Sequence, residues 1–439
     1  MNLRNQYALS TLGKTIPFAA ADAFSLYFYT DVAGIPPALA GAMVLTTLCW
    51  SALCDPLAGW LYQTKAAQNL GRRGYFIGGT LATTAFYILG FYRLLSGGWI
   101  WVVLLVMAMG FRFAYSLVDV PHNALLSALQ RRGQSPAQLG AMRLGATIAG
   151  TLITVMAARY ALGATVASAP SRFFLFAIAT GFAGALLFLG FFPFAAISTS
   201  TIDAQTSSTA HVASRTQLYV ASAAFVLSAV AATIINGMFS KDIVYIAKYV
   251  LHDTTWSVTG LVLFTIGKIV GLPGWILVSE RNGTVRMMAA AIVMIAATGI
   301  GIAIAPPHFS YLGTGLFFFG VGIAGTNIAG WALIPSCAGF FRKSHEPLFF
   351  GVFTAANKIA SGLSGAIIGY TLTRLGIGGG PISHDFQAKS LYWLVYIYPI
   401  LGAAIGIASI FTYAYCARPK TKSSATNLFL GMKDDTGAS

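Results

Sequence analysis

Ten ionisable residues lie inside apolar stretches that are long enough to cross a membrane. They are Lys14, Asp22, Asp55, Arg112, Asp119, Arg143, Lys241, Asp242, Lys268 and Lys358. A charge at the centre of a bilayer costs roughly 2.5–3.5 kcal/mol on insertion scales, so charged side chains kept there usually face a protein interior or a wet cavity. Buried charges of this kind bind or move an ion or a solute. The pattern therefore indicates a transporter with a polar path through an apolar body.

The elements that position these charges are twelve apolar segments. The 439 residues are 56% hydrophobic and 9% charged, and a membrane-spanning helix needs about 20 apolar residues. The predicted spans are 9–32, 38–62, 75–96, 98–128, 137–162, 171–197, 217–250, 255–279, 285–306, 308–335, 348–375 and 388–417. The sequence therefore predicts an all-α membrane protein.

One polar stretch divides the spans into two groups of six. Residues 198–216 are rich in Ser, Thr and Ala, and LAGWLYQTK (57–65) in the first group is echoed by LPGWILVSER (272–281) in the second. Such internal similarity is typical of transporters built from repeated halves. We expect the major facilitator fold, with two six-helix halves and a polar cytoplasmic tail. The predicted parts are an N-terminal half (1–197), a cytoplasmic linker (198–216), a C-terminal half (217–417) and a tail (418–439).

The chain has a net charge of +15. If both termini are cytoplasmic, most of the Lys and Arg residues fall in cytoplasmic loops, which is the bias expected of an inserted protein. We therefore expect cytoplasmic termini, with basic loops that suit contact with anionic lipids rather than nucleic acid. We expect a multi-pass protein of a bacterial inner membrane that needs only a monomer. The four cysteines have no metal-binding spacing, and no cofactor is expected.

Four motifs in the first half carry a resemblance to a known family. They are YTDVAG (29–34), CDPLAGW (54–60), GRRGYF (71–76) and VDVP (118–121). Together they resemble the glycoside–pentoside–hexuronide cation symporters, the melibiose permease-like branch of the major facilitator superfamily. The resemblance covers most of the chain and implies symport of a sugar-like solute with H⁺ or Na⁺ by alternating access.

The resemblance implies a cation-coupling role for Asp55. Thr354 and Ser116 match hydroxyl positions of that site, whereas Ser51 stands where cation-coupled relatives carry a second acid. Asp55 and Thr354 would be metal ligands only if the ion is Na⁺. A lone buried carboxylate is better suited to a proton, because burial penalises its charged form. The structural alternative is that Asp55 pins a helix end against Arg143.

A second group of residues surrounds Asp119, which matches the sugar-binding acid of the family. Arg112 lies two turns earlier on the same helix face, and His122 lies one turn later. A carboxylate can accept two hydrogen bonds from neighbouring sugar hydroxyls. The alternative is an internal ion-pair network that locks helices together. Asn123 adds a further polar group where packing alone favours apolar residues.

The resemblance implies further substrate contacts, some of them altered. Lys14 and Lys358 match family lysines, and Arg143 matches a fifth-helix arginine. Thr15 replaces a second sugar-binding acid, and Asn123 replaces an aromatic sugar-stacking residue. We expect all five to line the substrate site together with Asp119, Arg112 and His122.

Away from the ends of the predicted spans, the ten charged residues named above comprise six cations and four acids, and buried positive charge is costly unless an anion binds. This imbalance favours an anionic substrate such as a uronide, another carboxylated glycoside, or a phosphorylated or acidic lipid-like solute. The alternative is that Lys241 pairs with Asp242 and Lys268 extends its ammonium to a membrane interface.

Two other classes of function are alternatives to a sugar symporter. A transporter or exporter of lysophospholipids or other lipid-like solutes on the same scaffold is the second hypothesis, which a wide apolar cavity would favour. A membrane enzyme is the third, but the loops contain no carboxylate pair, no His/Asp cluster and no Gly-rich phosphate loop.

Overall fold

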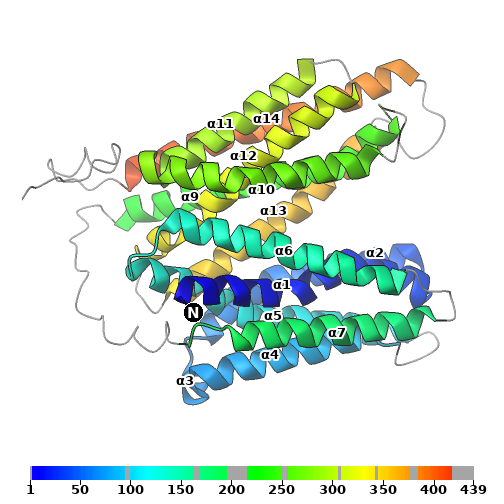
Figure 1. Ribbon diagram of the computed structural model, residues 1–439, viewed down its shortest axis with the longest axis vertical. Helices are drawn as coiled ribbons and strands as arrows, with labels where there is room; N and C mark the ends of the chain where they lie inside the picture. Colours follow the sequence, from blue (N-terminus) through cyan, green and yellow to red (C-terminus); the bar gives the residue numbers. More distant parts are fainter. Residues whose placement is uncertain are drawn as a thin grey trace, which may run out of the picture. The chain divides into compact units, whose positions relative to one another are not determined.

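The structure is a computed structural model of the full chain (Figure 1). It describes residues 2–93, 99–162, 168–194, 215–249, 251, 253, 256–304, 308–341, 345–374 and 384–417. All the regular elements in these residues are helices. The prediction of an all-α protein is confirmed.

Fourteen helical elements follow one another along the described residues. They are α1 (Leu3–Tyr27), the π-helix η1 (Phe28–Val32), α2 (Pro37–Leu61), α3 (Lys65–Asn69), α4 (Gly71–Gly90), α5 (Ile100–Arg131), α6 (Pro136–Leu162), α7 (Ala169–Gly190), α9 (Arg215–Tyr249), α10 (Trp256–Asn282), α11 (Thr284–Ile304), α12 (Phe309–Ala338), α13 (Glu346–Arg374) and α14 (His384–Cys416). Apart from η1 and α3, each has at least 20 residues, and eight are long and apolar enough in composition to cross a membrane.

Each predicted span coincides with one of the long helices, and the differences lie at their ends. The first helix starts at Leu3 because Asn2 caps it, its side chain accepting a hydrogen bond from the Arg4 amide. The predicted end of the sixth span at residue 197 is wrong, because α7 stops at Gly190. Pro193 follows three residues later, and a proline cannot donate the backbone hydrogen bond that would continue the helix.

The chain folds into two compact units. The first comprises Met1–Gln134, Met142–Ser207 and Phe341–Ile359, and the second comprises Ser135–Ala141, Ser208–Phe340 and Ala360–Ser439. The chain passes from one unit to the other within α6 and again within α13. The predicted halves remain a prediction, and residues 198–214 of the linker and the whole tail lie outside the described residues.

In the first unit, glycines bring α1 against α7. A Cβ atom on Gly13 would lie 2.5 Å from the Phe188 nitrogen, and one on Gly184 would lie 2.7 Å from the Gly13 carbonyl oxygen. Close approach of this kind is usual where small residues face each other between membrane helices. Aromatic rings from α1, α4 and α7 fill the rest of this core, among them Phe91 and Phe173.

The second unit is built mainly from α9, α10, α11, α12 and α14 (Figure 1). α10 packs on α12, where a Cβ atom on Gly267 would meet the Phe317 carbonyl group and one on Gly320 would meet that of Phe264. The Trp275 indole donates a hydrogen bond to the Val321 carbonyl oxygen at 2.7 Å. The described buried surface of this unit is largely apolar.

Candidate solute and coupling site

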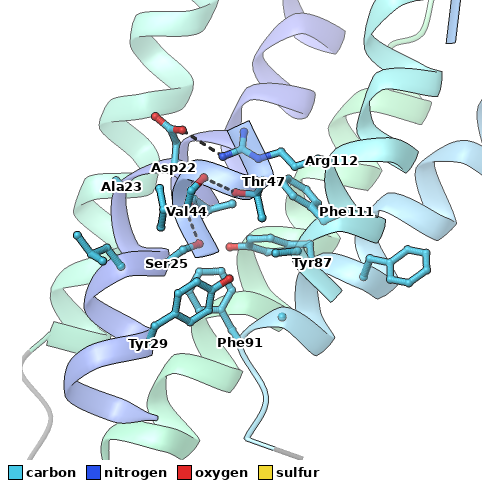
Figure 2. Close-up of a pocket in the computed structure, with 15 residues that line it drawn as sticks. Asp22, Ala23, Ser25, Tyr29, Val44, Thr47, Tyr87, Phe91, Phe111 and Arg112 are labelled. Atoms are coloured by element: carbon cyan, nitrogen blue, oxygen red, sulfur yellow. Dashed lines mark hydrogen bonds and ion pairs between the residues drawn. The ribbon is translucent and has the colours of Figure 1, made fainter. Parts of the chain in front are cut away.

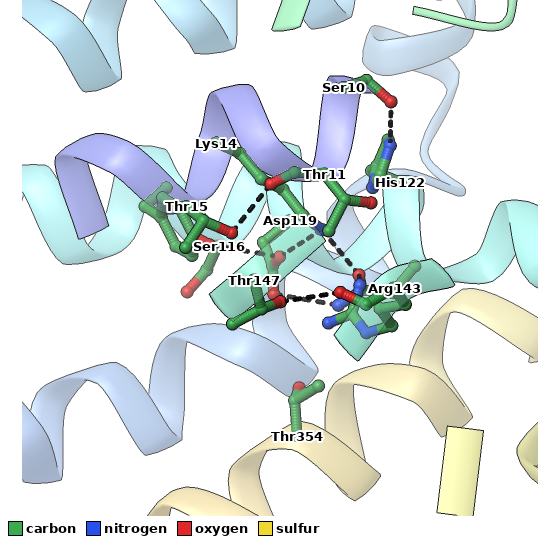
Figure 3. Close-up of polar contacts among 12 residues, drawn as sticks. Ser10, Thr11, Lys14, Thr15, Ser116, Asp119, His122, Arg143, Thr147 and Thr354 are labelled. Atoms are coloured by element: carbon green, nitrogen blue, oxygen red, sulfur yellow. Dashed lines mark hydrogen bonds and ion pairs between the residues drawn. The ribbon is translucent and has the colours of Figure 1, made fainter. Parts of the chain in front are cut away.

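The first unit holds a largely buried polar cluster between α1, α5 and α6, called here the Lys14 cluster. It consists of Lys14, Asp119, Asn123, Arg143 and Tyr7. Figure 3 labels Lys14, Asp119 and Arg143 of this cluster. Asp119 and Asn123 lie four residues apart on α5, which places both side chains on one helix face. Lys14 lies in the middle of α1, directly after Gly13, which contacts α7.

Lys14 is the centre of this cluster. Its Nζ atom donates hydrogen bonds to Asp119 Oδ1 at 2.6 Å and to Asn123 Oδ1 at 2.7 Å. The Asn123 amide in turn donates to Asp119 Oδ2 at 2.9 Å. Arg143 donates to the same Asn123 oxygen at 2.8 Å and to the Tyr7 hydroxyl at 3.3 Å. Four of the predicted substrate residues are thus in direct contact.

Two further predicted substrate residues, Thr15 on α1 and His122 on α5, have hydrogen-bond partners outside the Lys14 cluster. The Thr15 hydroxyl donates to the Thr11 carbonyl oxygen of its own helix at 2.8 Å. His122 is fully buried, stacks on Tyr7 with ring centroids 4.7 Å apart, and shares a 2.8 Å hydrogen bond with Ser10. His122 therefore supports the Tyr7 side of the cluster and lies next to it.

A second polar cluster, called here the Asp55 cluster, joins α2, α5 and α13. It consists of Asp55, Ser51, Ser116 and Lys358. Asp55 Oδ1 accepts hydrogen bonds from Ser116 at 2.6 Å and from Lys358 at 2.8 Å. Lys358 also donates to the Ser51 hydroxyl at 2.8 Å. Asp55 is completely buried, and its Oδ2 atom accepts no hydrogen bond from the described part of the chain.

Two glycines allow α13 to lie against α2 at this point. A Cβ atom on Gly351 would collide with the Asp55 carbonyl oxygen, and one on Gly59 would lie 2.5 Å from the Pro347 carbonyl oxygen. The close approach lets Lys358, two turns after Gly351, reach the carboxylate. The alternative in which Asp55 pins against Arg143 needs correction, since the described salt bridge of Asp55 is with Lys358.

Thr354 lies one turn before Lys358 on α13 but binds its own helix. Its hydroxyl donates to the carbonyl oxygens of Phe350 and Gly351, both at 3.0 Å, and Figure 3 shows it apart from the residues around Lys14. A hydroxyl that donates to its own helix keeps lone pairs with which it can accept or ligate. The Thr354 oxygen therefore keeps lone pairs for a ligand, and its predicted role as a cation ligand stays a prediction.

Helix α5 links the two clusters, because Ser116 and Asp119 are three residues apart on it. The Tyr115 hydroxyl donates to Asp119 Oδ1 at 3.4 Å, and Tyr115 directly precedes Ser116 on the helix. Taken together, the clusters contain three cations (Lys14, Arg143 and Lys358) and two acids (Asp55 and Asp119), so their formal charge is 3 − 2 = +1.

Arg112 is not in contact with the Lys14 cluster. Its guanidinium donates to Asp22 Oδ1 at 3.2 Å and lies over the Phe18 ring, 5.0 Å from the centroid. Arg112 and Asp119 are seven residues apart on one face of α5, and these two turns correspond to about 10 Å along the helix. Arg112 therefore belongs to a different part of the unit.

The remaining charged residues fall into two cases. Lys268, on α10, places its ammonium over the Phe264 ring at 4.0 Å from the centroid, a cation–π contact. The side chains of Lys241 and Asp242 lie outside the described residues. The sequence patterns did not indicate Tyr7 as a site residue, although it lies about two turns before Lys14 on α1.

The family model described as MFS/sugar transport protein matches residues 6–416. The chain belongs to this family. The predicted relationship to the melibiose permease-like sugar symporters is confirmed, and so is the major facilitator fold. The protein is a multi-pass membrane transporter of the secondary type for a sugar-like small solute, and it is not an enzyme.

Curated relatives agree with this membership. A glucuronide carrier protein homolog of Escherichia coli (strain K12) is 34% identical over 139 residues, which cover 31% of this chain and 30% of that protein. A putative sulfoquinovose importer of the same organism is 25% identical over 433 residues, which cover 92% and 89%. An isoprimeverose transporter of Lactiplantibacillus pentosus is 25% identical over 437 residues, which cover 93% and 88%.

Solved structures show the same fold. The proton:xylose symporter XylE bound to 6-bromo-6-deoxy-D-glucose has a TM-score of 0.67 at 10% identity, covering 92% of this chain and 94% of that one. A bacterial homologue of the iron transporter ferroportin in an outward-facing state has a TM-score of 0.66 at 12% identity, covering 94% and 100%. At these identities the likeness concerns the fold alone.

Proposed function

We propose that this member of the sugar transport family carries a small acidic sugar-like solute in symport with a proton. The solute binds at the Lys14 cluster, and the proton binds at Asp55. The observation that supports it is the formal charge of +1 on two adjoining polar clusters of the first unit, in which Lys14, Asp55 and Asp119 are buried and Arg143 and Lys358 are half-buried.

The unbalanced positive charge supports an anionic solute. Burying a charge without a counter-charge is costly, and an arriving carboxylate offsets that cost. Lys14 and Arg143 both bind Asn123 Oδ1, so both cations lie around one neutral amide. A solute carboxylate that displaces the amide oxygen gains charge-assisted hydrogen bonds, which are roughly twice as strong as neutral ones. Asp119 then remains to accept hydrogen bonds from sugar hydroxyls.

The names of the relatives point in the same direction, with one exception. Two relatives are named for sugars that bear an acid group, since glucuronides carry a carboxylate and sulfoquinovose carries a sulfonate. Isoprimeverose is a neutral disaccharide. The neutral sugar is therefore the competing substrate class that an experiment has to separate from the acidic one.

The geometry of Asp55 supports a proton as the coupling ion. The Lys358 ammonium already lies on Asp55 Oδ1 and Ser51 Oγ, two of the oxygens that a sodium ion would need. Sodium binding would have to displace this ammonium, and one carboxylate with three hydroxyls is a weak hard-cation site. The Oδ2 atom is buried without a described hydrogen-bond donor, so it can accept a proton with no rearrangement of Oδ1.

Protonation of Asp55 provides a route for coupling. A neutral Asp55 no longer holds Lys358, whose ammonium becomes free to act on Asp119 and on a solute acid in the Lys14 cluster. The positive charge offered to the solute increases, and so does its affinity. Because coupling is reciprocal, the bound solute raises the proton affinity of Asp55 by the same factor. Alternating access of the loaded carrier then moves both together.

The setting of the carrier is part of the proposal. We place it in a bacterial inner membrane with both termini cytoplasmic, working as a monomer whose basic loops contact anionic lipids. No cofactor takes part apart from the coupling ion. Residues predicted for sodium binding, Asp55 and Thr354 with Ser51 and Ser116, become ligands only if Lys358 leaves.

A transport assay with matched solutes tests the substrate class. The full chain is reconstituted in proteoliposomes, and entry of radiolabelled methyl β-D-glucuronide is measured with methyl β-D-glucoside or D-glucuronate as unlabelled competitor. The proposal predicts entry of the glucuronide and strong competition by D-glucuronate only. Competition by the neutral glucoside alone would overturn the acidic substrate class, and entry of lysophospholipid instead of either sugar would favour a lipid carrier.

A further inference from the structure

The first unit contains a cavity of about 200 Å³ between α1, α2, α4 and α5, apart from the Lys14 and Asp55 clusters, with a largely apolar lining that also holds Arg112 and Asp22. Figure 2 shows Arg112 and Asp22 joined at one side of it, with the rings of Tyr87, Phe91 and Phe111 around the space. All the lining residues belong to the first unit. None of them belongs to the Lys14 cluster or to the Asp55 cluster.

The two charges at this cavity differ in their surroundings. The Arg112 side chain is 7% exposed, whereas the Asp22 side chain that it contacts is 58% exposed. Their single hydrogen bond is 3.2 Å long. The guanidinium is therefore enclosed by the protein, whereas its carboxylate partner is largely uncovered by the chain. Where water reaches such an ion pair, the pair contributes little to stability because solvent screens it.

Two aromatic residues separate this cavity from the Lys14 cluster. The Phe18 ring lies under the Arg112 guanidinium, and it packs on the Tyr115 ring with centroids 4.8 Å apart. The Tyr115 hydroxyl reaches Asp119 on the other side. Along α1, Asp22 is eight residues after Lys14, which is about 12 Å of helix. One small sugar cannot contact both charged sites at once.

We propose that this cavity is a second binding site for a small acid, whose anionic group replaces Asp22 on Arg112. A guanidinium offers a planar pair of N–H donors that matches a carboxylate or sulfonate. Ser25, Tyr29 and Thr47 supply hydroxyl groups to the lining. The aromatic rings supply apolar faces on which a sugar ring or another flat apolar group can lie.

The size of the cavity defines the class of ligand. Pockets for drug-sized ligands have volumes of ~300–1,000 Å³, and this cavity is smaller. A hexuronic acid or a smaller carboxylate or sulfonate fits the volume, and a lysophospholipid does not. With the N-terminus in the cytoplasm, the cavity lies on the outer side of Lys14. An acid bound there is next to Phe18 and Tyr115, beyond which lies the transport site.

The inference that the bound acid is the transported solute rests on the proposed function. The existence of the site does not, because the cavity, the buried guanidinium and the exposed Asp22 are independent of Lys14. A binding measurement separates the two. It uses the full chain in lipid nanodiscs, isothermal titration calorimetry, D-glucuronate as the acidic probe and D-glucose as the neutral one.

Two substitutions assign the binding to its site. In Lys14→Gln the transport site is weakened, and the second site is expected to bind D-glucuronate as before. In Arg112→Gln the affinity of the second site for D-glucuronate is expected to fall by about tenfold or more, because a charge-assisted hydrogen bond to the acid is lost. Arg159→Gln is the matched control, since Arg159 is an exposed residue of α6. Any binding of D-glucose is expected to be the same in Arg112→Gln as in the wild type.

Two further variants keep the cavity testable if Arg112→Gln folds poorly. Ala108→Leu leaves both charges in place but fills the space, because Ala108 lines the cavity, and it is expected to abolish the second component. Asp22→Asn removes the competitor of the ligand, and it is expected to tighten D-glucuronate binding about two- to fivefold, the range of an exposed ion pair.

The outcomes that overturn the site differ from those that overturn the transport function. Binding that Lys14→Gln removes completely, with Arg112→Gln and Ala108→Leu like wild type, would exclude the second site and leave the proposed function intact. Arg112-dependent binding in a protein that transports no acidic sugar would support the site and contradict the transport proposal. No binding of D-glucuronate by the wild type would overturn the site.

Discussion

Lys358 Nζ lies 2.8 Å from Asp55 Oδ1, with the carboxylate fully buried and the lysine side chain 18% exposed. The ammonium of α13 thus occupies the position beside the α2 carboxylate that a coupling cation would need. The contact between α2 and α13 at this point depends on the charge of Asp55, because neutralising Asp55 removes the main attraction that holds Lys358.

Removal of Lys358 alone is expected to destabilise the protein more than removal of the pair. Lys358→Gln leaves a buried carboxylate without its counter-charge, which costs about 3–5 kcal/mol in comparable buried pairs. Adding Asp55→Asn removes that charge and is expected to restore most of the loss. Thermal unfolding of the purified single and double variants measures both effects.

The control for this comparison is Lys65→Gln, the same change at an exposed residue of α3, which is expected to leave the melting temperature unchanged. A double variant less stable than Lys358→Gln would show that the pair does not act as a unit.

The glycine contact between α2 and α13 predicts a sharp positional effect. In Gly351→Ala the new methyl group collides with the Asp55 carbonyl oxygen, so α13 has to move away from α2 and Lys358 from Asp55. We expect at least tenfold slower uptake, since a displacement of 1 Å at a functional group can cost about 10²-fold. Gly362→Ala on the same helix meets nothing within 4 Å and is the matched control. Equal transport by the two variants would show that the close approach is not required.

Lys14 is expected to select acidic over neutral solutes. In Lys14→Gln the affinity for an acidic glycoside should fall about 10- to 100-fold, the range of a hydrogen bond between charged groups, whereas any binding of the neutral glycoside should change less. Lys14→Arg keeps the charge and should retain the preference. Competition assays in proteoliposomes give both affinities. An equal loss for both solutes would assign Lys14 a role in positioning Asp119 and not in recognising an acid.

Much of the architecture could be predicted from the sequence, because membrane spans carry a strong signal. Each predicted span contains a helix, and errors occur at ends such as Gly190, where local turn chemistry and not hydropathy decides. Lys14, Asp119, Asn123 and Arg143 could be grouped because the family resemblance assigns each of them to the substrate site.

Other parts of the site could not be read from spacing. Seven residues place Arg112 on the face of Asp119, yet seven residues are also two turns, and Phe18 and Tyr115 fill the space between them. The partner of Asp55 depends on how closely α13 approaches α2, which only the paired glycines permit. The contacts of Tyr7 with Arg143 and His122 depend on how α1, α5 and α6 pack, which the spacing of residues along the chain does not give.

In the proposed mechanism, a proton on Asp55 drives the uptake of an acidic sugar. The most direct measurement is glucuronide accumulation in proteoliposomes under a proton gradient or a sodium gradient imposed separately, for wild type, Asp55→Asn and the control Glu280→Gln, an exposed acid. We predict accumulation under the proton gradient only, lost in Asp55→Asn while counterflow of the glucuronide persists, and unchanged in Glu280→Gln. Accumulation driven by sodium alone, or proton-driven accumulation that survives in Asp55→Asn, would contradict the account.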